Sequence, residues 1–204
     1  GVALYQLNGD ATDVSGNYDG TASNVTYGAG QFGQAGVFNN SSSKILYPSG
    51  SGAFDGSNTV RTISAWVKLN NTSTSLAYPF SVSSTTNSAA FFICEIKSDQ
   101  VRIDIRPGSS SNQANTFCSW TSNTNWNHFV FMLDGTRKIF INGVEQSVTH
   151  DNLGAADSSD WISYGGYDTL AQYSTGISRV VPSVKYTDGS IDQVRIFSRA
   201  LRPY

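Results

Sequence analysis

Charged side chains alternate with apolar ones between positions 95 and 106, in a spacing that could build a ligand-binding surface. Glu95 precedes a polar turn at 98–99, and Arg102, Asp104 and Arg106 follow it at every second position. Successive side chains of a β-strand point to opposite faces, so these charged groups share one face, opposite the apolar residues Val101, Ile103 and Ile105. Such a row can line a groove and hydrogen-bond a ligand, or it can form cross-strand ion pairs on a solvated sheet face. The sequence leaves both interpretations open.

A second candidate site is the segment 158–175, which is rich in aromatic, Gly, Ser and Asp residues. Aromatic rings stack on the apolar faces of sugars, and polar side chains beside them bind sugar hydroxyls. Long loops of this composition are more often functional than idle. We therefore predict ligand contacts from Trp161, Tyr164, Tyr167, Asp168 and Tyr173. The alternative is that part of these rings pack against the edge of the domain.

The sequence contains few groups suited to catalysis. His128 and His150 are its two histidines, and neither a Gly-x-Ser-x-Gly motif nor a Cys/His cluster with metal-binding spacing is present. Glu95 and Asp99 are separated by four positions, and the second falls in the turn. The sequence therefore predicts a protein that is not an enzyme and has no catalytic residue.

Composition narrows the classes of partner. The formal net charge is −2, and charged residues make up 14% of the chain, so no strongly basic surface for nucleic acid or anionic lipid is expected. No apolar run approaches the ~20 residues that a membrane-spanning helix needs. We expect neither nucleic-acid binding nor membrane insertion.

The pattern of short apolar segments predicts an all-β fold. Ser, Thr and Asn together account for 63 of the 204 residues, and they cluster with Gly and Asp between segments that alternate with a period of two. Many short strands separated by such clusters are typical of a sandwich or barrel. Because no linker-like segment interrupts the pattern, we expect a single domain over 1–204. The predicted strands include 62–69, 91–96, 101–106, 115–120, 128–133, 137–141 and 190–197.

The strand register can be read at two places. Asn142-Gly143 suits the positive φ angles of a type I′ turn, which predicts a tight hairpin between 137–141 and 144–145. A turn at 98–99 would place Cys94 opposite Ile103, and a turn around 108–113 would place Ile103 opposite Cys118. The two cysteines would then lie about 9–10 Å apart, beyond the Cα separation of about 7 Å that a disulfide allows. We expect buried free thiols, and a disulfide would show that the strand order is wrong.

Three groups of segments, taken in order, resemble a known family. The first comprises residues 4–17 and 33–38. The second comprises Ile63-Ser64-Ala65-Trp66-Val67, Trp126-Asn127-His128-Phe129-Val130 and residues 139–144. The third is 189–201, which contains Ile191-Asp192-Gln193-Val194. This order is similar to concanavalin A-like, laminin G-like jelly-roll domains over nearly the whole chain, and the first segment is also similar to domains of tailed-phage virion proteins, especially marine ones.

The resemblance implies two stacked antiparallel sheets, a curved groove on one side and pairing of the first strand with the last. It places Trp66 and Trp126 in the core, and the predicted register adds Trp120 to the core. Such folds most often bind glycans or proteins, but some are enzymes, so fold alone does not assign function. Laminarinase-like relatives carry Glu-x-Asp-x-x-Glu on one strand, and the segment 95–99 departs from that pattern.

The resemblance also implies a structural calcium ion where the first and last strands meet. Asp192 matches the acidic position that contributes a side chain there, with backbone carbonyls and Asp10 or Asp13 as further oxygen donors. Alternatively, Asp10 and Asp13 are turn residues that bind nearby backbone amides, and Asp192 belongs to a structural hydrogen-bond pair.

Together these observations favour a non-catalytic, lectin-like recognition module. We expect it to bind a glycan or polysaccharide on a cell surface, in an extracellular or virion-surface setting where other virion proteins are candidate partners. The alternatives are a structural or protein–protein interaction domain of a virion, and an atypical polysaccharide-cleaving enzyme.

Overall fold

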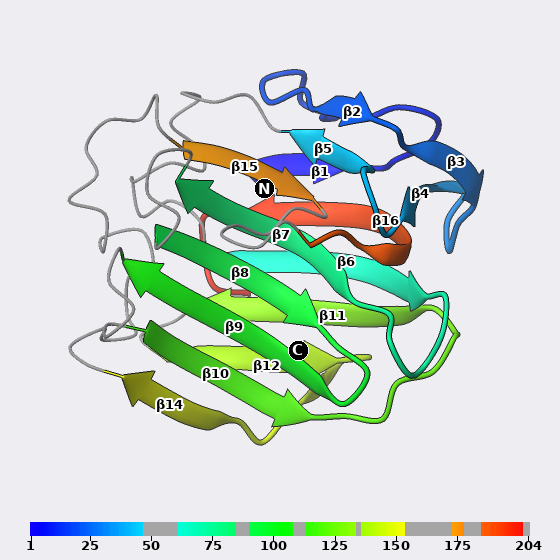
Figure 1. Ribbon diagram of the computed structural model, residues 1–204. Coiled ribbons are helices and arrows are strands. Elements are labelled where there is room, and N and C mark those ends of the chain that lie inside the picture. Colours follow the sequence, from blue (N-terminus) through cyan, green and yellow to red (C-terminus); the bar gives the residue numbers. More distant parts are fainter. Residues whose placement is uncertain are drawn as a thin grey trace.

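The regular elements of the protein are all strands. The structure is a computed structural model that describes residues 1–46, 61–84, 90–107, 113–133, 136–153, 173–177 and 185–201. Within these ranges no residue is helical, and no described helix is long and apolar enough to cross a membrane. Figure 1 shows two layers of strands stacked face to face, which confirms the predicted all-β, two-sheet jelly-roll sandwich.

Sheet I forms the rear layer of Figure 1. Its strands run in the order β13 (Val144–Glu145), β12 (Arg137–Ile141), β11 (Asn127–Leu133), β6 (Thr62–Leu69), β16 (Asp188–Phe197), β4 (Gln34–Asn39) and β3 (Thr26–Ala29). The first strand, β1 (Ala3–Tyr5), pairs antiparallel with the last strand, β16, as the family resemblance implies. A register shift between Asp192 and Arg195 divides β16, so its first half pairs with β4 and its second half with β1.

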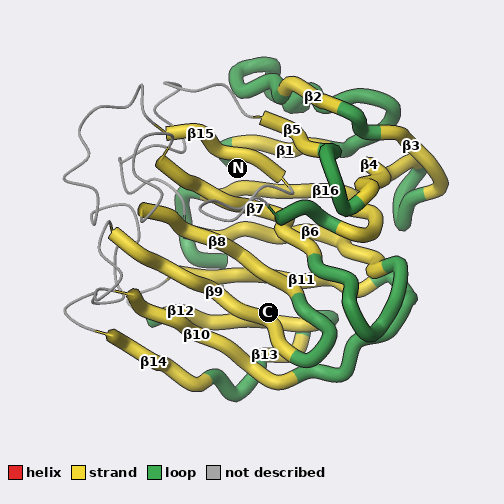
Figure 2. The backbone as a smooth tube through the Cα atoms, in the orientation of Figure 1, coloured by secondary structure: helices red, strands yellow, loops and turns green. Residues whose placement is uncertain are grey.

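Sheet II forms the front layer. Its order is β14 (Thr149–Leu153), β10 (Gln113–Ser119), β9 (Gln100–Pro107), β8 (Ala90–Ile96), β7 (Ala77–Ser84), β15 (Tyr173–Ile177), β5 (Lys44–Leu46) and β2 (Thr21–Ser23). Neighbouring strands in the central part of the sheet are also consecutive in sequence, which forms the predicted meander. Figure 2 shows most of the described loops at one end of the strands.

The core lies between the two sheets. Sheet I contributes Ile63, Ala65 and Val67 from β6, and sheet II contributes apolar residues at alternate positions of β8 and β9. Because strand side chains alternate, a period of two in the sequence is sufficient to fill one inner face per strand. Burying each large apolar side chain contributes about 1.5–3 kcal/mol relative to exposure.

Two of the three tryptophans expected in the core lie elsewhere. Trp66 points to the outer face of sheet I and is partly exposed, and Trp126 is also partly exposed. The alternation that buries Ala65 and Val67 forces Trp66 outward, which overrides the expectation from the resemblance. Trp120 does pack on the core against Phe129, and its Nε1–H donates to the backbone carbonyl of Lys97 at 2.7 Å.

Cys94 and Cys118 are buried and free, as predicted. Cys94 lies opposite Ile103, but Cys118 lies opposite Val101, whereas Ile103 faces Thr116. The predicted register of the second pair was therefore wrong by two residues. An even shift leaves every side chain on its own face, so the cysteines remain in the core. Burial raises the pKa of both thiols, which keeps them protonated and unreactive.

The Asn142-Gly143 hairpin is present, with φ angles of 51° and 82°. The Asn142 side chain accepts a hydrogen bond from the backbone N–H of His128 at 2.8 Å and donates one to Asn127 Oδ1 at 3.0 Å. Asn142 therefore supplies both the left-handed backbone and the link between the turn and β11.

We predict that Asn142→Ala lowers the free energy of unfolding by about 2 kcal/mol, because alanine resists a positive φ and both side-chain hydrogen bonds are lost. Urea denaturation measures this change. Val144→Ala, in the same hairpin and 63% exposed, is the control and should change stability little. Equal stability of the two variants would contradict the role of Asn142.

Candidate ligand-binding face

The charged residues predicted to share one face do so on the outer face of sheet II. Glu95 on β8 lies directly opposite Arg102 on β9, and Asp104 follows on the same face two residues later. Their apolar neighbours Val101, Ile103 and Ile105 are buried on the inner face. The alternation seen in the sequence therefore separates a core face from a polar face in a single strand.

Arg102 connects the two carboxylates. Its Nη2 lies 3.1 Å from Asp104 Oδ1, and its Nε lies 4.0 Å from Glu95 Oε2. Lys97 Nζ lies 3.7 Å from the same Glu95 oxygen. One cross-strand ion pair, Arg102 with Glu95, is thus confirmed, whereas Arg102 and Asp104 pair within β9. The face is not solvated at the acids, since Glu95 and Asp104 are each only 7% exposed. The result is a largely buried polar cluster, which we call the Arg102 network.

Tyr78 completes the Arg102 network from β7. Its hydroxyl donates a hydrogen bond to Glu95 Oε1 at 3.1 Å, and its ring is fully buried beside Ile93. Ala77 and Phe80 both face the main core although they are three residues apart, because β7 is irregular between them. Such an irregularity re-aims one side chain, here Tyr78, to the outer face. Tyr78 could not be predicted from the sequence, because strict alternation gives no sign of the irregularity in β7.

Burial controls the electrostatics of the Arg102 network. The pKa of Asp104 is raised to about 6, mainly by desolvation on burial; the neighbouring Glu95 contributes to the rise, whereas Arg102 opposes it. Burial and Glu95 also raise the pKa of the Tyr78 phenol, which therefore remains a hydrogen-bond donor. A carboxyl that titrates near pH 6 can donate or accept a hydrogen bond within an ordinary range of pH.

The other predicted ligand contacts are only partly described. Arg106 lies on β9 and Tyr173 on β15, where the backbone is described but the side chains are not. Trp161, Tyr164, Tyr167 and Asp168 lie outside the described residues. Because β15 pairs with β7, Tyr173 belongs to the same sheet as the Arg102 network. The aromatic contacts stay a prediction.

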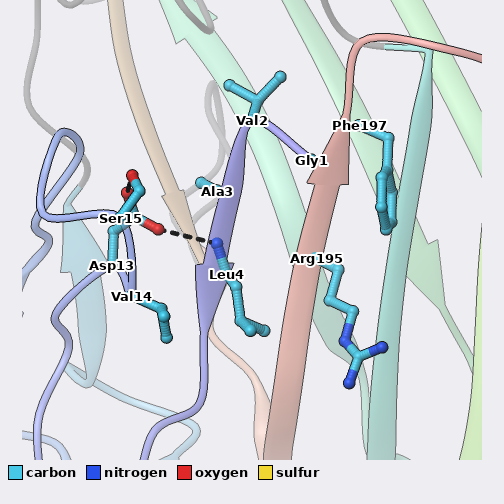
Figure 3. Close-up of a pocket in the computed structure, with 9 residues that line it drawn as sticks. All are labelled: Gly1, Val2, Ala3, Leu4, Asp13, Val14, Ser15, Arg195 and Phe197. Carbon is cyan, nitrogen blue, oxygen red and sulfur yellow. Dashed lines mark hydrogen bonds between the residues drawn. The ribbon is translucent and has the colours of Figure 1, made fainter.

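Asp10 and Asp13 make local turn contacts. Asp10 accepts hydrogen bonds from the backbone N–H and the hydroxyl of Thr12 at 3.0 and 2.7 Å. Asp13 accepts one from the backbone N–H of Leu4 at 2.8 Å, drawn as a dashed line in Figure 3, and another from the Ser15 hydroxyl. Asp13 thereby occupies the N–H of Leu4 at the edge of β1. The turn interpretation of these two residues is confirmed.

Asp192 is fully buried in the irregular part of β16. Its Oδ2 accepts a hydrogen bond from the backbone N–H of Phe32 at 2.8 Å, whereas its Oδ1 has no hydrogen-bond partner among the described residues. Burial raises the pKa of this carboxyl. Across the described part of the chain, Asp10, Asp13 and Asp192 do not form a group of three acids that could hold a metal ion.

An open pocket of about 450 Å³ lies beside β1. Figure 3 shows Leu4 on β1 with Val14 beside it, and Arg195 and Phe197 on the adjacent strand β16. Its lining is mainly apolar, and Val14 is 61% exposed. No local sequence pattern predicts this pocket, because the residues that line it come from both ends of the chain.

Structural neighbours share the architecture at low sequence identity. A carbohydrate-binding module, CBM40, of a Ruminococcus gnavus sialidase matches with a TM-score of 0.59 and 15% identity, over 89% of this chain and 94% of the module. The binding domain of botulinum neurotoxin serotype C1 matches with a TM-score of 0.66 and 14% identity, over 98% of this chain but 49% of the other. A leech intramolecular trans-sialidase matches with a TM-score of 0.54 and 17% identity, over 71% of this chain and 22% of the enzyme.

The family is shown by the sequence itself. No curated protein matches the chain. A profile of a laminin G-like family, described as the concanavalin A-like lectin/glucanases superfamily, matches residues 38–203. That match covers most of the chain and agrees with the two-sheet architecture. The chain therefore belongs to the concanavalin A-like lectin/glucanases superfamily.

Proposed function

We propose that this domain is a non-catalytic module that binds glycans on the outer face of sheet II. The observation that carries the proposal is the Arg102 network, in which one guanidinium, two carboxylates and a phenol converge on the outer face of sheet II. Binding sites for small polar ligands place a few such groups so that their hydrogen bonds fix the orientation of the ligand.

The chemistry of the Arg102 network suits sugar hydroxyls. Glu95 and Asp104 accept hydrogen bonds, and the Arg102 side chain, which is 19% exposed, keeps donors at the surface. Aromatic rings of the segment 158–175, together with Tyr173 on the same sheet, would add stacking. Binding would then depend on hydrogen bonds and stacking with little net charge.

The contacts of the two carboxylates favour binding over glycan cleavage. Glycosidases use one carboxylate as nucleophile or base and a second as acid, both directed at the scissile bond. Here Arg102 contacts Glu95 and Asp104 together, and Tyr78 also donates to Glu95. The release of reducing ends or unsaturated products from polysaccharides would instead support the enzyme alternative.

The structural neighbours support recognition as the general role. One structure of the Ruminococcus gnavus module is bound to α2,3-sialyllactose, and a botulinum neurotoxin binding domain is in complex with rat synaptotagmin II. A protein partner is therefore the second candidate for this chain. We place the function outside the cell, on a cell or virion surface, where glycans and receptors of this kind are found.

A glycan array tests the proposal. We expect binding by the unmodified domain and a loss of about tenfold or more in Arg102→Gln, because a charge-assisted donor is removed. Trp161→Ala and Tyr167→Ala should weaken binding without unfolding the domain. Lys138→Gln is the control, since Lys138 lies on sheet I and pairs with Glu145. No binding by any form, or full binding by folded Arg102→Gln, would contradict a glycan site at the Arg102 network.

The pH dependence of stability tests the environment of Asp104. Its folded pKa of about 6 exceeds the ordinary value of 3.8, so folding disfavours its ionised form. The corresponding stability is fully present below about pH 4 and is lost as the pH rises through 6, by up to about 3 kcal/mol. Asp104→Asn should remove this decline in urea unfolding measured from pH 4 to pH 7. An identical pH profile in the variant would contradict the shift.

We also propose that Asp192 holds a structural calcium ion, with Oδ1 as its carboxylate donor and backbone carbonyls as further ligands. The fit rests on Oδ1, which is buried and without a described hydrogen-bond partner. Asp10 and Asp13 are occupied by turn contacts, so this proposal no longer includes them. The proposed calcium ion is structural and takes no part in catalysis.

If calcium is bound, a chelator should lower the melting temperature by several degrees, and added calcium should restore it. Asp192→Asn should make the melting temperature independent of chelator. Asp10→Asn, which alters an acid outside the proposed site, should keep the sensitivity of the unmodified domain. A melting curve that does not change in chelator would refute the proposal.

A further inference from the structure

Three aromatic rings gather on the outer face of sheet I, on the opposite side of the sandwich from the Arg102 network. Trp66 on β6 lies beside His128 on β11, with ring centroids 5.1 Å apart. Phe32, from the loop between β3 and β4, meets Trp66 edge-on at 5.8 Å and is 52% exposed. We call these three residues the Phe32 platform.

The Phe32 platform is held in place from beneath. The fully buried carboxylate of Asp192 accepts the backbone N–H of Phe32 at 2.8 Å, which fixes the loop over β16. Gly30 permits this approach, since a Cβ there would lie 2.8 Å from Asp192 Oδ2 and 2.6 Å from the carbonyl oxygen of Gln34. The His128 ring is fixed by a 2.7 Å hydrogen bond between Nε2 and the Ser64 hydroxyl. An exposed ring that is anchored in this way loses little conformational freedom when a ligand binds.

The exposed charges beside the Phe32 platform are cationic. Arg195 on β16 lies directly opposite Ser64, and Lys68 follows Trp66 by two positions on β6; both are exposed. Burial lowers the pKa of His128 first, and the nearby Arg195 lowers it further. Three acids of the described residues lie near this surface. Asp192 and Asp13, which lines the same pocket as Arg195, are buried and accept hydrogen bonds from the backbone amides of Phe32 and Leu4. Glu145 is paired with Lys138 at the sheet edge, so the acids here are recessed or paired, whereas Arg195 and Lys68 are exposed. The surface is therefore complementary to an anionic ligand.

Arg195 also connects the Phe32 platform to the pocket beside β1. It lines that pocket together with Leu4, Val14 and Phe197, and it pairs in register with Leu4 on one side and Ser64 on the other. From β1 across β16 and β6 to β11 there are three strand spacings, or about 14 Å. The Phe32 platform, Arg195 and the pocket thus form an extended strip that is longer than a single sugar ring.

We propose that this strip is a second binding site, which takes an acidic polysaccharide bearing carboxylate or sulfate groups. Sugar rings stack on Phe32 and Trp66, and the anionic groups pair with Arg195 and Lys68. The site differs from the Arg102 network in sheet, face and charge. A module with a glycan site on each face could connect two chains of one polysaccharide matrix.

The test measures binding of alginate, dextran sulfate and neutral dextran to the domain by isothermal titration calorimetry. We expect both acidic polymers to bind more tightly than dextran, more weakly at high salt, and more tightly as long chains than as single sugars. Comparing the affinities for alginate and dextran sulfate shows whether carboxylate or sulfate groups are preferred. Phe32→Ala and Arg195→Gln should each reduce affinity by about tenfold, and Arg195→Gln should also reduce the salt dependence.

The control variants distinguish binding at this strip from binding elsewhere on the domain. Val144→Ala alters an exposed residue and Lys138→Gln a partly exposed one, both elsewhere on sheet I, and both variants should bind as the unmodified domain does. Arg102→Gln should keep the affinity for acidic polymers, because Arg102 lies on the other sheet. This test therefore does not depend on whether the Arg102 network binds a glycan. Wild-type affinity in folded Phe32→Ala, equal binding of neutral dextran, or loss of binding in Arg102→Gln would overturn the proposal. If poly-glutamate bound as tightly as the acidic polysaccharides, and Phe32→Ala did not weaken its binding, the strip would instead be assigned to an acidic protein segment.

Discussion

The pairing of β16 with three other strands is the constraint on which the rest of the structure depends. This strand pairs with β6 along its length, with β4 in its first half and with β1 in its second half. The change of partner occurs at the irregularity between Asp192 and Arg195, where Gln193 adopts a φ of 50°. Because one strand joins both ends of the chain, it also fixes the Phe32 loop through Asp192 and positions Arg195 beside the pocket.

Sheet II shows how a polar cluster can be kept largely buried. Removing Glu95 and Asp104 from water is unfavourable unless each carboxylate is paired and hydrogen-bonded. Arg102 contacts both, and Tyr78 donates to Glu95, so the network offsets part of the desolvation penalty. The remaining penalty appears as the raised pKa of Asp104. A carboxyl group whose pKa is strongly shifted by burial and a charged neighbour is found at binding and catalytic sites and in structural ion-pair networks.

The two outer faces of the sandwich have different chemistry. The outer face of sheet II combines acids and bases in one network, whereas the Phe32 platform on sheet I combines one exposed and two partly exposed aromatic rings with positive charge at its margin. The formal net charge of −2 conceals this difference, because it sums charges that lie on opposite sides of the molecule. Local arrangement, and not overall charge, therefore indicates which ligands each face suits.

Alternation and turn chemistry determined much of the fold from the sequence by itself. A period of two placed Ile63 and Val67 in the core and gathered Glu95, Arg102 and Asp104 on one face, and Asn142-Gly143 specified its hairpin. These features depend on neighbouring residues, whose geometry a local pattern can express. The remaining features of the fold and of the two candidate sites were decided only by the tertiary structure, because they depend on contacts between segments that are distant in the sequence. The register of Cys118 followed from strand pairing, the outward turn of Tyr78 from an irregularity in β7, and the meeting of Phe32, Asp192 and Trp66 from the packing of a loop onto β16 and β6.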